Sequence, residues 1–450
     1  MKRNLLCAAV SAGVLAAAAP ATAMPDYAAD VSADYQRELG SLFDWFHRNP
    51  ELSFKEVNTA ARMARELRAI PGIDVTEKVG GTGVVGVMKN GPGPVVLVRA
   101  DMDGLPVEEK SGLANASKLR QVDIDGVEKP VMHACGHDTH ITALVGTARR
   151  LAAMRDRWKG TVLFVVQPAE ERIGGAKAMV EDGLYTRFPK PAYALAFHVD
   201  SETPTGMVSA AEGLQYSSSD SVDITVPGIG AHGASPHTGR DPVYMASQLV
   251  IALQGLVSRE RQPLTPAVIT VGSFHAGLKH NIISDEARLQ LTVRSNDEAE
   301  RKRLIDGIRR VARGIGELNG MPADKMPVVK VVEGTGVTYN DPALARRLNG
   351  VLARTLGETA FKPFVQTDMG AEDFPYFIQP ETGVKGYYFI VGGTPQAVFD
   401  AVASGGPPVP SHHSPLFKIT PEPAIVTGTV AMTAAVLDLL APGGVAATGQ

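Results

Sequence analysis

Three apolar runs constrain the fold most, and each ends in residue types that can bind metals or transfer protons. The runs are PVVLVRAD (94–101), TVLFVVQPAEE (161–171) and AYALAFHVD (192–200). Near-continuous apolar runs are typical of strands covered on both faces, as in a parallel sheet. Helical spacing of apolar residues in 141–154 and 176–182 predicts helices between these strands. Because ligands bind at the carboxyl ends of parallel strands, one site is expected where the runs end.

The segment MHACGHDTH (132–140) is the densest group of candidate metal ligands. Cys135 and His137 stand two apart around Gly136, so both side chains can reach one centre from a bent loop. Thiolate and imidazole are the ligands that a zinc-like ion prefers. An isolated Cys-x-His is more often a buried thiol beside loop histidines. The three strand ends favour the metal-binding interpretation here.

The length of 450 residues predicts two domains, one interrupted by the other. From residue 217 the pattern changes to strand, helix, two strands, charged helix and strand, which is typical of a small α+β domain. We therefore expect an inserted domain at 217–333, flanked by two parts of a larger domain at 24–216 and 334–440. The Gly/Ala-rich segment 441–450 is expected to be disordered. A net charge of −4 without a basic stripe argues against a nucleic-acid partner.

The N-terminus has the pattern of a secretory signal peptide, predicted at 1–23. Lys2 and Arg3 precede an apolar run, 5–19, and a small-x-small cleavage pattern follows at Ala21-Thr22-Ala23. The run is short for a membrane span, so a membrane anchor is the weaker interpretation. We expect an exported protein, periplasmic or secreted, that is not membrane-bound after cleavage. Cleavage would remove Cys7 and leave Cys135 without an intramolecular disulfide partner.

Eight motifs in a fixed order resemble one enzyme family over about residues 35–440. They are RADMDGLPVEE, MHACGHDTH, QPAEE, AFHVD, GIGAHGASPH, HNIIS, MGAEDF and HHSP. The family is that of the dinuclear metallohydrolases that include hippurate hydrolase, auxin-conjugate amidohydrolases, N-acyl-amino-acid amidohydrolases and related carboxypeptidases. The resemblance implies an α/β catalytic domain with a mixed, largely parallel sheet covered by helices. It also implies an inserted α+β lid domain that dimerises.

The resemblance places the family's functional residues on positions of this chain. The implied metal ligands are Cys135, His137, Glu171, His198 and His413. They imply two divalent metal ions, zinc or manganese first, with cobalt or nickel as alternatives. Glu170 matches the general base, and Asp103 matches an acid that orients a ligand histidine. Because His412 and His413 are adjacent, the last ligand is ambiguous, and the residue before Ser-Pro is chosen.

The lid supplies the remaining candidates. His232 matches a histidine that reaches across the dimer to the substrate carbonyl, where it would stabilise an oxyanion. Asn281 and Arg294 match positions associated with the substrate carboxylate. A plain turn histidine and a strand-surface arginine are the alternatives for His232 and Arg294. His237, His133 and His140 are expected to be structural or supporting residues.

These features predict an exported, metal-dependent amidohydrolase that cleaves the amide bond of hippurate-like N-acyl amino acids. Its small-molecule partner would be an N-acyl amino acid or a short peptide, and a homodimer or higher oligomer is implied by the resemblance. A carboxypeptidase or dipeptidase is the first alternative. A catalytically inactive periplasmic protein that binds metal or ligand is the second. The polar excursion 118–129 is longer than in compact relatives and is expected near the rim of the substrate site.

Overall fold

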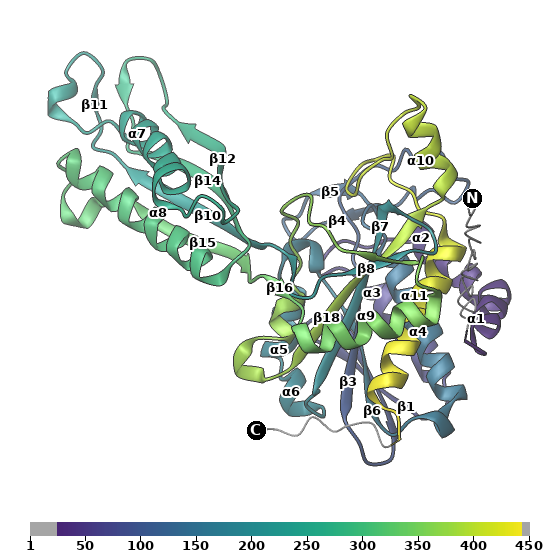
Figure 1. Ribbon diagram of the computed structural model, residues 1–450. Helices are drawn as coiled ribbons and strands as arrows, with labels where there is room; N and C mark the ends of the chain where they lie inside the picture. Colours follow the sequence, from purple (N-terminus) through teal and green to yellow (C-terminus); the bar gives the residue numbers. More distant parts are fainter. Residues whose placement is uncertain (1–24, 443–450) are drawn as a thin grey trace, which may run out of the picture.

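An eight-stranded mixed sheet forms the centre of the computed structural model, which describes residues 25–442 (Figure 1). Four of its seven strand pairs are parallel, which confirms the expected mixed, largely parallel sheet. In spatial order the strands are β1 (Ile73–Val79), β2 (Gly83–Asn90), β6 (Gly160–Gln167), β3 (Val95–Asp101), β7 (Tyr193–Pro204), β18 (Lys385–Thr394), β8 (Val208–Ala210) and β17 (Phe361–Pro363). The predicted signal peptide, 1–23, lies outside the described residues.

Helices cover both faces of this sheet, so its central strands are buried on both sides. Along β3, Val96 and Val98 belong to the core of one face, and Leu97 belongs to the core of the other. This alternation explains why the strands read as continuous apolar runs. The helices of the first face are α2 (Gly40–Arg48), α3 (Val57–Arg68), α4 (His137–Ala153), α9 (Pro342–Leu356) and α11 (Pro421–Leu439). The second face is covered by α5 (Gly175–Glu181) and α6 (Leu184–Arg187).

Helix α11 is long and apolar enough to cross a membrane by length and composition. It instead lies in the protein core, because 67% of its most apolar window is buried. It runs beside α4, where the Thr429 hydroxyl donates to the Ala143 carbonyl at 3.5 Å. Two shorter helices complete the body: α1 (Ala28–Asp34), which packs near α11, and α10 (Gln396–Ala403). Helix α11 is therefore a core element of the described structure.

A second body, the lid, projects away from the central sheet (Figure 1). It has an antiparallel sheet in the order β12–β14–β10–β15 and a hydrophobic core of its own. Its elements are β10 (Ser218–Pro227), α7 (Pro242–Gly255), β12 (Ala267–Ala276), β14 (Glu286–Ser295), α8 (Glu298–Leu318) and β15 (Val328–Thr335). The chain enters through β10 and leaves through β15, so the lid is inserted between two parts of the larger domain. The predicted α+β lid is thereby confirmed.

Three small two-stranded pairs lie outside the two main sheets. Strands β9 (Leu214–Tyr216) and β16 (Thr338–Tyr339) pair where the chain passes between them. Strands β11 (Ala231–His232) and β13 (Ile282–Ile283) pair at the far end of the lid (Figure 1). The polar excursion forms a hairpin of β4 (Arg120–Val122) and β5 (Glu128–Pro130). Its turn residues Asp123 and Ile124 line a small hollow together with Glu171.

Candidate metal centre

The Cys135–His137 loop depends on the glycine between its two candidate ligands. Gly136 has a φ of +83°, and a β-carbon there would lie 2.4 Å from a methyl carbon of Val199. Only glycine adopts this left-handed turn at low cost and also leaves room for Val199. Helix α4 begins at the next residue, so His137 is fixed by the helix while Cys135 stays on the preceding loop.

The Glu170–Glu171 turn follows β6 directly and is held by the carboxylate of Asp103. Backbone N–H groups of Glu170 and Glu171 each donate to this carboxylate at 3.1 Å. Ser53 donates to it from its hydroxyl at 2.6 Å. The turn is flanked by Ala169 and Ile173 at φ values of +48° and +50°, which are costly for residues with a β-carbon. Asp103 therefore stabilises a strained turn that presents both glutamates.

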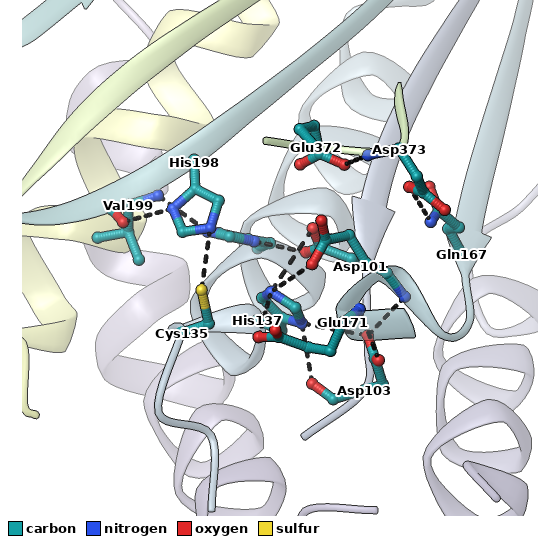
Figure 2. A network of polar contacts seen from close by, with 12 residues as sticks. Asp101, Asp103, Cys135, His137, Gln167, Glu171, His198, Val199, Glu372 and Asp373 are labelled. Atoms are coloured by element: carbon teal, nitrogen blue, oxygen red, sulfur yellow. Dashed lines mark hydrogen bonds and ion pairs between the residues drawn. The ribbon is translucent and has the colours of Figure 1, made fainter. Parts of the chain in front are cut away.

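Asp103 also orients the imidazole of His137. The His137 Nδ1 lies 2.8 Å from the Asp103 backbone oxygen and 3.3 Å from its carboxylate. Nδ1–H donates to these oxygens, which leaves Nε2 with its lone pair directed into the site. Figure 2 shows this imidazole between Asp103 and the other candidate ligands.

All five sequence-predicted ligands meet in overlapping groups around Cys135. Its sulfur lies 3.4 Å from His198 Nε2, and these two atoms cluster with an imidazole nitrogen of His137 within 4.8 Å (Figure 2). A second group with the same spacing contains Cys135, Glu171 and His413, where His413 Nε2 lies 3.5 Å from a Glu171 oxygen. Two groups that share one thiolate are the arrangement expected for a pair of ions.

The chemistry of these residues fits a pair of divalent cations. Within residues 25–442, His137 Nε2 and Glu171 Oε1 are buried and have no hydrogen-bond partner. Burial and the nearby acids raise the pKa of the Cys135 thiol well above its usual value. Burial also raises the pKa of Glu171 to about 8, although His137 opposes this shift. Because burial disfavours the anionic forms of Cys135 and Glu171, these side chains need nearby positive charge to lose their protons. Bound divalent cations would supply that charge.

Glu170 stands beside these groups with a different environment. Burial, followed by the charges of Glu372 and Glu171, raises the pKa of Glu170 well above its usual value. Its carboxylate lies within 3.9 Å of His137 Nε2 and lines the same cavity. Glu170 is therefore positioned to accept a proton inside the site rather than to interact with solvent.

His412 and His413 have clearly different partners. His412 Nε2 lies 3.0 Å from the Val199 carbonyl oxygen, whereas His413 is directed to Glu171. The backbone N–H of His413 donates to Ala134 at 2.8 Å, and its φ is +64°. The backbone is thus turned so that the second of the two histidines reaches the ligand group.

This difference predicts separable effects of two neighbouring substitutions. His413→Ala should reduce the bound metal from two ions per chain toward one, because it removes a candidate direct ligand. His412→Ala should retain both ions and weaken metal affinity by about 10–100-fold at most, as loss of a supporting contact does. Elemental analysis after equilibrium dialysis measures both values. Equal metal content in the two variants would contradict the choice of His413.

Two other motif histidines have supporting roles or none that the contacts reveal. His140 is paired on both nitrogens, with Asp101 at 2.6 Å and with the Val199 backbone N–H at 2.8 Å. It therefore joins the first turn of α4 to β3 and β7, and it has no free lone pair for an ion. His133 is buried, and burial lowers its pKa to about 4.

A buried ionic network beneath the site was missed by the motif analysis. Arg99 is fully enclosed and donates to Asp101 at 2.6 Å and to Glu372 at 2.5 Å and 3.1 Å. The hydroxyl of Tyr388 also donates to Glu372, at 2.6 Å. Figure 2 shows Glu372 and Asp373 on the side of the site opposite Cys135. An arginine inside an apolar strand run was the available signal, since buried arginine is rarely found without an anionic partner.

A cavity of about 950 Å³ opens beside the metal ligands, between the central sheet and the base of the lid. It is lined by Cys135, Glu170, Glu171, His198 and His413, and by Arg294 of the lid. Burial lowers the pKa of Arg294 from its usual value, and its guanidinium donates to the Met369 carbonyl at 3.2 Å. Arg294 is therefore part of the cavity wall rather than a plain surface charge.

His232 and Asn281 lie elsewhere, at the far end of the lid, and do not line this cavity (Figure 1). They are neighbours there, because the Gly233 N–H donates to the Asn281 carbonyl at 2.8 Å. His232 accepts a hydrogen bond from the Ala234 N–H on Nδ1 at 3.0 Å. In this structure of one chain, these residues therefore do not join the candidate metal ligands.

Comparison with known proteins gives a consistent result. The model of peptidase family M20/M25/M40 matches residues 97–403. Hippurate hydrolase from Campylobacter jejuni is 37% identical over 77% of this chain and 86% of its own. Thermostable carboxypeptidase 2 from Saccharolobus solfataricus is 36% identical over 81% of this chain and 89% of its own.

Solved structures agree with the sequence matches. A putative aminohydrolase from methicillin-resistant Staphylococcus aureus superposes with a TM-score of 0.80 at 28% identity, over 91% of this chain and 98% of its own. A Bacillus subtilis protein described as a dinuclear metal-binding peptidase of the M20 family gives a TM-score of 0.71 at 27% identity, over 91% of this chain and 99% of its own.

Proposed function

This chain belongs to peptidase family M20/M25/M40, and we propose that it is an exported dinuclear metallohydrolase of N-acyl amino acids. It is a metal-dependent hydrolase that acts on amide bonds. The observation that carries the proposal is the convergence of Cys135, His137, Glu171, His198 and His413 beside Glu170 at one end of the sheet. Zinc or manganese is proposed for the ion pair.

The residues of the chain divide the hydrolysis between them. Bound divalent cations would polarise the amide carbonyl and lower the pKa of a water molecule. Glu170 then accepts the proton of that water and passes it to the leaving nitrogen. Arg294, on the cavity wall, is placed to bind the carboxylate of the amino acid.

Hydrolysis assays on the mature protein test the substrate class. The metal-free protein is reconstituted with zinc, manganese, cobalt or nickel and assayed with hippurate and with unblocked dipeptides. We expect hippurate-like compounds to be cleaved faster, because the proposed substrate has no free amino group. Faster cleavage of dipeptides would instead favour the carboxypeptidase or dipeptidase alternative, which the carboxypeptidase relative supports. No turnover with any metal would favour an inactive binding protein.

A homodimer is proposed because His232 lies away from the cavity of its own chain. If His232 acts across the dimer, Glu170→Gln and His232→Ala chains should complement each other. Each mixed dimer would then contain one intact site, so random mixing of inactive parents should restore roughly a quarter of wild-type activity. The measurement is activity after the two chains are unfolded together and refolded. Mixtures no more active than the parents would contradict a role for His232 in the partner's site.

Export is proposed from the pattern of residues 1–23. Mass spectrometry of the protein from the periplasm or medium should find an N-terminus near Met24. A full-length chain retained in the cytoplasm would contradict export.

A further inference from the structure

The segment 364–372, which we call the pocket loop, connects the lid to the surroundings of Glu170. All nine of its residues line the cavity. At its end, Glu372 lies with Asp373 and Glu170 in a group whose carboxylate oxygens are within 4.8 Å of one another. A displacement of this loop would therefore change both the cavity wall and the position of a charge beside the general base.

Three side chains join the pocket loop to the base of the lid. Gln366 accepts a hydrogen bond from Asn296 Nδ2 at 2.7 Å, and its own amide donates to the Ser217 hydroxyl at 3.0 Å. The Ser217 hydroxyl in turn donates to Asn296 Oδ1 at 2.5 Å. Asn296 follows strand β14 of the lid, and Ser217 precedes β10, where the chain enters the lid. The three side chains thus form a closed ring of hydrogen bonds across the junction.

Further hydrogen bonds link the same two parts. Arg294 of β14 donates to the Met369 carbonyl at 3.2 Å. The Ser217 N–H donates to Gly370 at 2.9 Å. Where the chain leaves the lid, the Thr335 hydroxyl donates to the Glu372 carbonyl at 3.0 Å. Both chain crossings therefore contact the pocket loop.

The pocket loop has no helix or strand of its own between β17 and the turn that begins at Phe374. Its shape therefore depends on these external hydrogen bonds rather than on a regular backbone ladder. Glu372 is fixed at the other end by Arg99 and Tyr388. A lid movement that breaks the Gln366 ring would act on a short segment whose far end is anchored beside Glu170.

We propose that Gln366 is a positioning residue that couples the lid, through Asn296 and Ser217, to the pocket loop and so to the alignment of Glu170. This inference deepens the proposed function and rests on it for its kinetic test. Asn296 does not line the cavity, so its substitution can affect turnover only through the contacts that it makes.

The decisive variant is Asn296→Ala, which breaks the ring from the lid side. We expect kcat to fall about tenfold or more, because small misplacements of reacting groups are costly, while KM changes less than about threefold. Metal content and melting temperature should match those of the wild type. Asn319→Ala is the matched control, since Asn319 donates to the Gln248 side chain at 2.7 Å within the lid and away from the pocket loop.

A double-mutant cycle tests the pairing itself. If Asn296 acts through Gln366, the variant with both residues changed to Ala should lose no more kcat than the stronger single variant. The exchanged pair Asn296→Gln with Gln366→Asn should restore part of kcat, because it retains an amide on each side. If the two single substitutions lower kcat by independent factors that multiply in the double variant, the proposal is overturned. A kcat equal to that of the control, or a kcat loss explained by lost metal or lost stability, would also overturn it.

Hydrogen exchange separates this inference from the assignment of substrate. In Asn296→Ala, backbone amides of 364–372 should exchange at least about threefold faster than in the control, although the substitution lies in the lid. This measurement requires no substrate. Unchanged exchange would overturn the coupling even in an active enzyme, whereas a failure to hydrolyse N-acyl amino acids would overturn the proposed function alone.

Discussion

Glu170→Gln should lower kcat by about 10²–10⁴-fold, the usual contribution of a general base, while both metal ions remain bound. Glutamine has the size of glutamate and can form hydrogen bonds, but its amide cannot accept a proton from water. Glu170 is 6% exposed, and its backbone N–H donates to the Asp103 carboxylate, which holds the side chain in the site after β6. The measurements are steady-state kinetics on hippurate and elemental analysis of the same preparation.

Glu317→Gln on the exposed surface of α8 is the matched control and should have wild-type kinetics. Activity of Glu170→Gln within tenfold of the wild type would show that another group takes the proton. A parallel loss of metal and activity would instead make Glu170 a ligand, and the division of work between Glu170 and Glu171 would be wrong.

Arg99→Met should lower the free energy of unfolding by about 3–5 kcal/mol, the usual cost when one partner of a buried ionic group is removed. Arg99 is completely enclosed, and its guanidinium contacts Asp101, Glu372 and Asp373. Methionine fills much of the same volume, so the loss reports the uncompensated carboxylates rather than a cavity. The measurement is denaturant unfolding of the metal-free protein, so that metal binding does not contribute to stability.

Arg313→Met provides the comparison for this prediction. Arg313 is 75% exposed and contacts Glu317 one helical turn away on α8, so its loss should change stability by no more than about 0.5 kcal/mol. Equal stability of the two variants would mean that the carboxylates around Arg99 become protonated at little cost. In that case the network would not be a main source of stability beneath the site.

Glu170, Glu171 and Arg99 all lie in or directly after buried strands, but the sequence indicates a role only for the two glutamates. Glu170 and Glu171 were identified from their place after an apolar run, because the end of a buried strand is where a polar pair must have a purpose. Arg99 lies in a run of the same kind, yet its partners Glu372 and Asp373 are more than 270 residues away in the chain. Spacing alone cannot indicate a contact of that separation.

The sequence by itself determined the class of sheet, the inserted α+β lid and the candidate ligands. Local rules govern the sheet, the lid and the Cys135–His137 pair, because side-chain periodicity follows the backbone and a pair two residues apart needs only a short bend. The remaining ligands were implied by the ordered motifs that resemble a known family. The sequence left the His412–His413 pair ambiguous apart from the family position before Ser-Pro, and the tertiary structure shows that His413, at a φ of +64°, is the one that faces Glu171. The tertiary structure also decided that Arg294 lines the cavity while His232 lies at the distant end of the lid. Such outcomes depend on how separate segments pack in space, and no local pattern records that packing.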